Sequence, residues 1–371
     1  MSTSFGAAIC KSLGVGAAWL GLVAALGLPL ARAQNPAATP SPTGDTPAAA
    51  APAAASLAPS AATAPTTSPP TDLLNTAGLL NGSLALKDKR FYVSEYRVLV
   101  EVGGQVTANT RAAYFGGTNY GATRMSVKYD ASSMDLAALQ QLVDRAYADF
   151  LIRLESAGIK PEPPAAITRE FGEVYEANQP GSAAAALVHD DLDLGYGKRK
   201  YLVLTPTGMQ LNSRGFAGLG AGNLGNRMTY IKSNIEAISV ALAVHIAAQE
   251  SSGGGSSLFK QGSSANASAA MEIAAAGRAV AVQSHAHTQT LQIKGPLAVP
   301  GDFATLKEAG GYDSQKDGAV VAIQALGRLF GQAANTSKRV DMAVEVNMPA
   351  MTQMALRGLS SINQAIAASV K

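Results

Sequence analysis

Ile238-Ser-Val-Ala-Leu-Ala-Val-His-Ile246 is the stretch on which the predicted fold depends. Its large aliphatic residues alternate with small or polar ones, and successive side chains of a strand point to opposite faces of a sheet. A second extended run, Ile273–Ile293, follows Ser251–Ser268, which is rich in glycine and serine and has the composition of a flexible loop. The sequence therefore predicts a long antiparallel hairpin within residues 228–294.

The length of this hairpin permits two interpretations. A hairpin that crosses a membrane needs arms of about 9–11 residues with an apolar outward face. The first arm meets this requirement, whereas the second places Ser284, Thr288 and Thr290 on the face of Val280 and Val282. The pattern favours the other interpretation, in which the two arms are central strands covered on one side by helices.

Residues 1–33 have the pattern of a secretory signal peptide. Lys11 supplies the basic start, Leu13–Leu30 the apolar stretch, and Ala31-Arg32-Ala33 a cleavage site of the small-x-small type. Glycines and a proline within the apolar stretch favour cleavage, and an uncleaved N-terminal anchor is the alternative. No cysteine stands at the cleavage site, so a lipid anchor is not predicted.

Cleavage at this site would change the inventory of reactive and charged residues. Cys10 is the chain's one cysteine, so the mature protein would have no disulfide, no thiolate nucleophile and no Cys-ligated metal. Of 29 basic residues Lys11 and Arg32 would be lost, which leaves 27 against 26 acidic residues. This balance favours neither nucleic acid nor an anionic membrane surface as a partner.

Composition divides the remaining chain in two. Residues 34–72 are almost wholly alanine, proline, threonine and serine, and this predicts a disordered or polyproline-like linker. Residues 73–371 are predicted to form a single domain that contains the hairpin. Signal peptide and linker together predict an exported protein that is periplasmic or extracellular, with association with the outer membrane as a further option.

Both strand and helix periods occur within this domain. Alternating residues predict strands at Arg90–Val102, Val106–Phe115, Arg124–Tyr129, Lys200–Thr205 and Arg339–Val346, with a turn at Gly103-Gly104. Apolar residues three or four apart predict helices at Ser133–Gly158, Ile167–Ala177, Gln315–Ala334 and Ala350–Val370, and a helical turn at Phe303–Ala309. The predicted fold class is α+β: a mostly antiparallel sheet with a long hairpin, packed against several helices.

Two histidines in the second arm suggest a metal site. His285 and His287 are two residues apart, so on a strand both imidazoles share one face. His245, on the neighbouring arm, is the best candidate for a third ligand. The simpler interpretation, which we favour, places His285 and His287 on the solvated face of a strand beside Gln283 and Gln289.

Other motifs give weaker signals. Gly220-Ala-Gly222-Asn-Leu-Gly225 matches a dinucleotide fingerprint, but β-type sequence follows it where a helix N-terminus is required. Lys198-Arg199-Lys200 is interpreted as an exposed basic turn. Nucleophile elbows and paired catalytic carboxylates do not occur in the sequence. We therefore predict neither an enzyme nor a bound cofactor.

The order of elements resembles that of the curli secretion channel family. The residues that carry the resemblance are the helix segment LQQLVDRAYADFLIRLESAG (139–158) and glycine-rich Gly215–Gly225, followed by Ile238–Ile246. The resemblance implies a periplasmic α/β domain that contributes two hairpins per subunit to an outer-membrane barrel. The chain departs from that family in lacking the lipidation cysteine. The mature region is also similar to exported bacterial proteins whose family implies no activity.

These observations predict a non-enzymatic, exported envelope protein that acts as an oligomeric assembly or secretion component. Its expected partners are copies of itself or other envelope proteins. The alternative is a soluble periplasmic or surface module that binds a ligand or metal.

Overall fold

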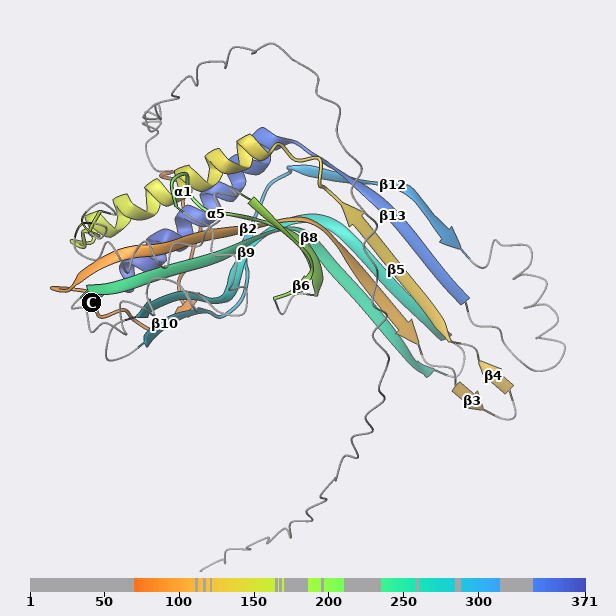
Figure 1. Ribbon diagram of the computed structural model, residues 1–371. Helices are drawn as coiled ribbons and strands as arrows, with labels where there is room; N and C mark the ends of the chain where they lie inside the picture. The colour runs from red at the N-terminus through yellow and green to blue at the C-terminus, as the bar shows by residue number, and fades with distance from the viewer. Residues whose placement is uncertain are drawn as a thin grey trace, which may run out of the picture. The chain divides into compact units, whose positions relative to one another are not determined.

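The computed structural model describes residues 70–371 apart from 111–112, 116–117, 121, 164–165, 167–168, 170–185, 195–196, 210–234, 258–259, 284–287 and 314–335. Within the described ranges, most of the chain is in strands, and two long helices lie against them (Figure 1). The helices are α1 (Leu136–Ser156) and α5 (Met348–Ala368).

One strongly curled sheet contains nearly all the strands. Its order is β1 (Leu80–Asn81), β10 (Thr288–Ile293), β9 (Lys260–Gln283), β8 (Ile235–Ser257), β2 (Arg90–Thr110), β5 (Thr123–Asp130), β13 (Thr336–Val346) and β12 (Ala304–Asp313). β11 (Leu297–Val299) pairs with β9, while β7 (Lys198–Leu204) pairs with β2 and with β6 (Ala186–Asp193). β3 (Ala113–Phe115) and β4 (Thr118–Tyr120) form a separate pair. The β2–β8 and β5–β13 pairs are parallel, and the others are antiparallel.

The predicted hairpin is confirmed, and its two arms reach closer to its tip than expected, but the prediction that the second arm continues to Ile293 is wrong, because β9 ends at Gln283 and β10 folds back to pair antiparallel with it. β8 and β9 pair antiparallel from Ala237↔Gln283 to Ser257↔Lys260. The prediction of a flexible loop at Ser251–Ser268 is wrong, because the ladder continues through these glycines and serines. Backbone hydrogen bonds form a ladder without large side chains, so a partner strand overrides the loop composition.

The two helices begin where two neighbouring parallel strands end. α1 follows β5 and its N-cap is Asp135, whose carboxylate accepts a hydrogen bond from the Ala137 N–H at 2.9 Å. α5 follows β13, and Asn347 caps it in the same way. Both helices therefore run back along the same face of the sheet (Figure 1). The sequence predictions for these two helices are confirmed.

The sheet beneath the helices is buried on both faces. On the helix-facing side, alternate residues of β2 and β8 such as Val98, Val100 and Leu242 join the main core. On the opposite side, Leu99 and Ala243 pack in a second cluster with Tyr201, Val203, Ala241 and Ala276. The strict alternation of Ile238–Ile246 thus separates large residues, which contact the helix layer, from small ones, which face the second cluster.

The predicted fold class is wrong. The described part of the chain is mainly β, and its two helices cover only part of one curled sheet (Figure 1). Phe303–Ala309, predicted as a helical turn, largely belongs to β12, where a partner strand decides the conformation of a short segment with weak helix period. The predicted helix Gln315–Ala334 lies outside the described residues, as does nearly all of Ile167–Ala177.

A bend in the sheet replaces the predicted turn at Gly103-Gly104. β2 continues to Thr110, but it leaves β8 after the Val100↔Val244 pair and pairs with β5 from Gly103 onward. Ladder irregularities occur between Glu101 and Gly103 and between His245 and Ala247. A Cβ atom on Gly103 would lie 2.9 Å from the carbonyl oxygen of Tyr129, so glycine permits the strands to cross closely here.

Candidate functional site

A buried ion pair lies at the bend of the sheet. Glu101 is wholly buried and Arg199 is 4% exposed, and the Arg199 guanidinium donates a hydrogen bond to the Glu101 carboxylate. The hydroxyl of Tyr129 donates to the other carboxylate oxygen and accepts a hydrogen bond from Gln249 Nε2 at 2.6 Å. A charge at this depth is stable only with such a set of partners.

The side chains of this ion pair also form hydrogen bonds with backbone groups at the irregularity in β8. The N–H of Ile246 donates to Glu101 Oε2 at 3.1 Å, and Arg199 Nη1 donates to the carbonyl of Ala247 at 2.8 Å. Burial raises the pKa of Glu101, while Arg199, Tyr129 and the Ile246 N–H act in the opposite direction. The arrangement therefore fixes the bend, and its burial leaves the carboxylate inaccessible to a substrate.

His245, one of the three predicted metal ligands, is wholly buried beside this ion pair. Its Nε2 lies 3.0 Å from the hydroxyl of Tyr201, and the two rings are 5.9 Å apart. Burial and the charge of Arg199 lower the pKa of His245 to about 3, so the imidazole is neutral at physiological pH. His285 and His287 lie outside the described residues, so the three-histidine site stays a prediction.

Two negative findings apply to the described part of the chain. Within it, no three or more histidine, cysteine, aspartate or glutamate side chains converge as a metal site would require. No described helix combines the length and the apolar character that crossing a membrane requires. The glycine motif Gly220–Gly225 lies in the range 210–234, outside the described residues.

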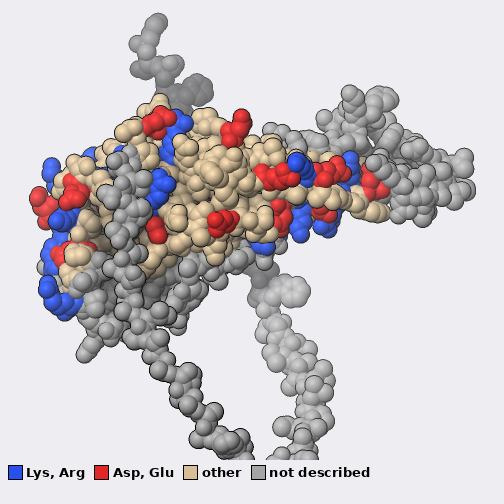
Figure 2. All heavy atoms as spheres, turned by 90° about the horizontal axis from the view of Figure 1, so that it is seen from above, with Lys and Arg blue, Asp and Glu red and all other residues tan. Residues whose placement is uncertain are grey.

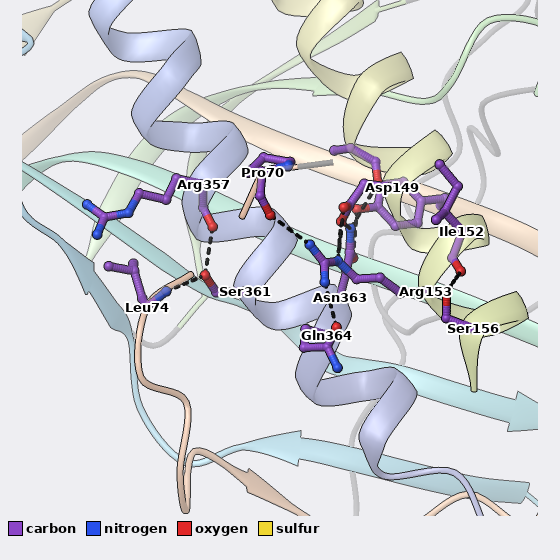
Figure 3. Close-up of polar contacts among 12 residues, drawn as sticks. Pro70, Leu74, Asp149, Ile152, Arg153, Ser156, Arg357, Ser361, Asn363 and Gln364 are labelled. Carbon is purple, nitrogen blue, oxygen red and sulfur yellow. Dashed lines mark hydrogen bonds and ion pairs between the residues drawn. The ribbon is translucent and has the colours of Figure 1, made fainter. Parts of the chain in front are cut away.

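A hydrogen-bond network joins the sheet to α5 and α5 to α1, and Figure 3 shows the part of it that lies on the two helices. It starts in the core at Tyr96 of β2, whose hydroxyl donates to Asn363 Oδ1 of α5 at 3.1 Å. Asn363, also wholly buried, donates through Nδ2 to the carbonyl of Ala146 at 2.9 Å and to Asp149 Oδ2 of α1 at 3.1 Å. The network thus fixes α5 against α1 and both helices against the sheet.

The network continues from Asp149 to the molecular surface. Arg153 Nε lies 2.9 Å from both carboxylate oxygens of Asp149, one helical turn away. The guanidinium of Arg153 also donates to Gln364 Oε1 and, at 3.2 Å, to the carbonyl of Pro70 (Figure 3). Residues at the N-terminal start of the described chain are therefore connected to the core through one line of polar contacts.

A hollow of about 590 Å³ lies where β5 and β13 meet the starts of α1 and α5. Methionines contribute to its lining, and its charged residues are of both signs: Lys128, Asp130, Arg339, Asp341 and Glu345. Arg339 pairs with Asp341 at 2.8 Å. The hollow therefore presents no large excess of either charge that would select an ionic ligand.

Sequence reasoning missed the residues that carry the polar contacts. The prediction that Lys198-Arg199-Lys200 is an exposed turn is wrong, because the run belongs to β7 and the two-residue period points Arg199 inward at Glu101. An available signal was Glu101 within the apolar strand pattern Arg90–Val102. Asn363 gave no comparable signal, since a single asparagine in a helix stripe does not identify its partners.

Comparison with protein-family models, with curated proteins and with solved structures finds no match to this chain.

Proposed function

We propose that this chain is a non-enzymatic, exported envelope protein that assembles with copies of itself through the strands that extend past its helix layer. The proposal combines the predicted signal peptide and linker with the arrangement of the sheet. The observation that carries it is the edge strand β12.

β12 offers a long edge for strand pairing. It pairs antiparallel with β13 from Ala304↔Val346 to Asp313↔Lys338, and none of the described strands lies on its other side. An extended edge of this kind presents backbone N–H and C=O groups to which another chain can add a strand. Proteins that stay monomeric usually shorten or block such an edge, and β12 keeps ten residues at the edge although its ladder has one irregularity, between Glu308 and Gly310.

The strands near this edge extend beyond the helices. In Figure 1, β5, β12 and β13 continue to the right, past the ends of α1 and α5. Below the bend, Val106, Ala108 and Val127 are buried on one face, together with Ala265 and Ala267 of β9. Among the described residues, this half of the sheet therefore keeps an apolar inner side that neither α1 nor α5 covers.

The outer face of the same strands is polar. Lys307 of β12 pairs with Glu345 of β13 at 2.6 Å, and Arg339 pairs with Asp341. Figure 2 shows blue and red residues intermixed on the narrow right-hand part, whereas much of the broader part is tan. Mixed charges keep this face in water and permit copies to approach edge to edge without net repulsion.

The test compares two substitutions at one position of β12. Ala309 is exposed and lies at the irregularity between Glu308 and Gly310, where it has no partner in the β13 register. Ala309→Pro places a residue without an N–H at this unpaired position, where proline is tolerated in sheets, so it should weaken the addition of a strand along β12. Ala309→Ser keeps the N–H and is the matched control.

The measurement is the mass of the mature protein in mild detergent by native mass spectrometry. We expect a multi-subunit particle for the wild type and for Ala309→Ser, and a smaller particle for Ala309→Pro. A strictly monomeric wild-type protein would overturn the proposal. An identical assembly in all three proteins would exclude the β12 edge as the contact.

A further inference from the structure

The chain's first described residues, Pro70–Leu74, lie across both helices (Figure 3). The carbonyl of Pro70 accepts from Arg153 of α1 at 3.2 Å. The carbonyl of Asp72 accepts from Arg357 Nε of α5 at 3.0 Å, and the N–H of Leu74 donates to Ser361 Oγ at 2.9 Å. Alternate residues of this segment thus bond to polar side chains of the helix pair, and between them the chain bends at Thr71–Asp72, where the Leu73 N–H donates to the Thr71 carbonyl at 3.1 Å.

The helix side chains that contact the segment are held in place by hydrogen bonds with other residues of α1 and α5. Arg153 is oriented by Asp149, whose side chain is 2% exposed, and by Gln364. Ser361 is almost wholly buried, and its hydroxyl donates to the carbonyl of Arg357 at 2.7 Å, which leaves the oxygen to accept from Leu74. Pre-oriented donors and acceptors reduce the entropy lost when a segment binds.

The segment side is recognised mainly through its backbone. Two carbonyls and one N–H make the backbone contacts, the partly buried Leu74 side chain packs against the main core, and the one charged contribution is the Asp72 carboxylate, 2.9 Å from Arg357 Nη2. The Asp72 side chain is 80% exposed, so its ion pair is well screened by solvent. The segment is thus held by three backbone hydrogen bonds, one apolar side chain and one screened ion pair.

The chain beyond this segment is attached much more firmly. The carbonyl of Leu79 accepts from the N–H of Lys294, and β1 pairs with β10. Leu84 is wholly buried and exchanges backbone hydrogen bonds with Ser369 and Lys371 at the C-terminal end. A weakly held stretch, Pro70–Leu74, therefore precedes a tightly held one.

We propose that the α1–α5 pair is a binding site for a short peptide segment and that its occupant is the chain's own Pro70–Leu74 segment. Bound there, the segment fixes Pro70 against the helix layer. Released, it would free the nine residue steps to Leu79, about 30 Å of extended chain. The site thus determines the starting point and the reach of the N-terminal segment, independently of whether copies assemble.

The test uses two neighbouring serines of α5. Ser361→Ala removes the acceptor of the Leu74 N–H, whereas Ser360→Ala makes the same change at a buried hydroxyl that has no hydrogen-bond partner among the described residues. Hydrogen exchange of the Leu74 amide is measured in the full chain. We expect protection in the wild type, unchanged protection in Ser360→Ala, and about tenfold faster exchange in Ser361→Ala.

A second variant separates release of the segment from general unfolding. Arg357→Gln removes the bonds to Asp72 and should also accelerate exchange at Leu74, while amides of β8 keep their protection. Cleavage at Leu73 or Leu74 by a leucine-selective protease should rise in the same variants. An unprotected Leu74 amide in the wild type, or equal exchange in the two serine variants, would overturn the proposal.

Discussion

Gly358 of α5 lies directly against Ile273 of β9. A Cβ atom at position 358 would come within 2.6 Å of Ile273 Cγ1 and within 2.8 Å of Val299 Cγ2. The helix therefore approaches the sheet as closely as a residue without a side chain permits. This contact sets the spacing between α5 and the two strands β9 and β11.

Gly358→Ala is expected to destabilise the protein by about 1–2 kcal/mol. Overpacking costs about 1–3 kcal/mol, and the better helix propensity of alanine returns up to about 1 kcal/mol. Ser360→Ala, two residues away, should be neutral or slightly stabilising because it removes a buried hydroxyl that has no hydrogen-bond partner among the described residues. Urea denaturation of the two variants checks the prediction, and equal stabilities would contradict it.

The ion pair at the bend should behave as a coupled unit. Glu101→Leu leaves the Arg199 charge buried, and Arg199→Met leaves the Glu101 carboxylate buried, so each should cost about 3–5 kcal/mol. The double variant should be less destabilised than the sum of the single variants, because it removes both charges. A double-mutant cycle by urea denaturation at pH 7 measures the coupling, and additive costs would refute it.

Loss of Asn363 should cost more than loss of the single hydroxyl it binds. Asn363→Leu leaves the Ala146 carbonyl, the Asp149 carboxylate and the Tyr96 hydroxyl without this partner in a buried interface, at a cost of about 2–4 kcal/mol. Tyr96→Phe removes one hydrogen bond and should cost about 1 kcal/mol. Urea denaturation of the two variants gives their free energies of unfolding. A larger loss of stability in Tyr96→Phe than in Asn363→Leu would contradict the prediction.

Acid should destabilise the protein partly through His245. Its folded pKa of about 3 lies below the unfolded value, so between pH 6.5 and pH 3 the unfolded state binds more protons. The free energy of unfolding should then fall as pH falls, by up to about 1.4 kcal/mol per pH unit. Glu101 acts in the opposite sense, because its pKa is raised on folding.

A substitution isolates the histidine from this background. His245→Gln removes the titration and retains a polar group near Tyr201. The loss of stability between pH 7 and pH 4 should be smaller in this variant by about 3 kcal/mol. Identical pH profiles for the variant and the wild type would show that His245 is protonated at the same pH in both states.

Local patterns were sufficient where one period persisted over many residues. Ile238–Ile246 predicted a strand and the pairing of β8 with β9, and the stripe ending at Leu154 predicted α1. They failed where a partner strand outweighed composition. The serine- and glycine-rich end of the hairpin and the Gly103-Gly104 pair both continue as strands, because a neighbouring backbone supplies their hydrogen bonds.

The sequence by itself determined the hairpin, the two helices and which residues of β8 share a face, since periodicity is a local property that side-chain alternation records directly. Only the tertiary structure decided the curl of the sheet, the burial of Arg199 against Glu101 and the contacts of Asn363. These depend on ladder irregularities and on residues far apart in the chain, such as Tyr96 and Asn363. A pairing at that separation leaves no period in the sequence, so it becomes visible only when the sheet and the helices are packed together.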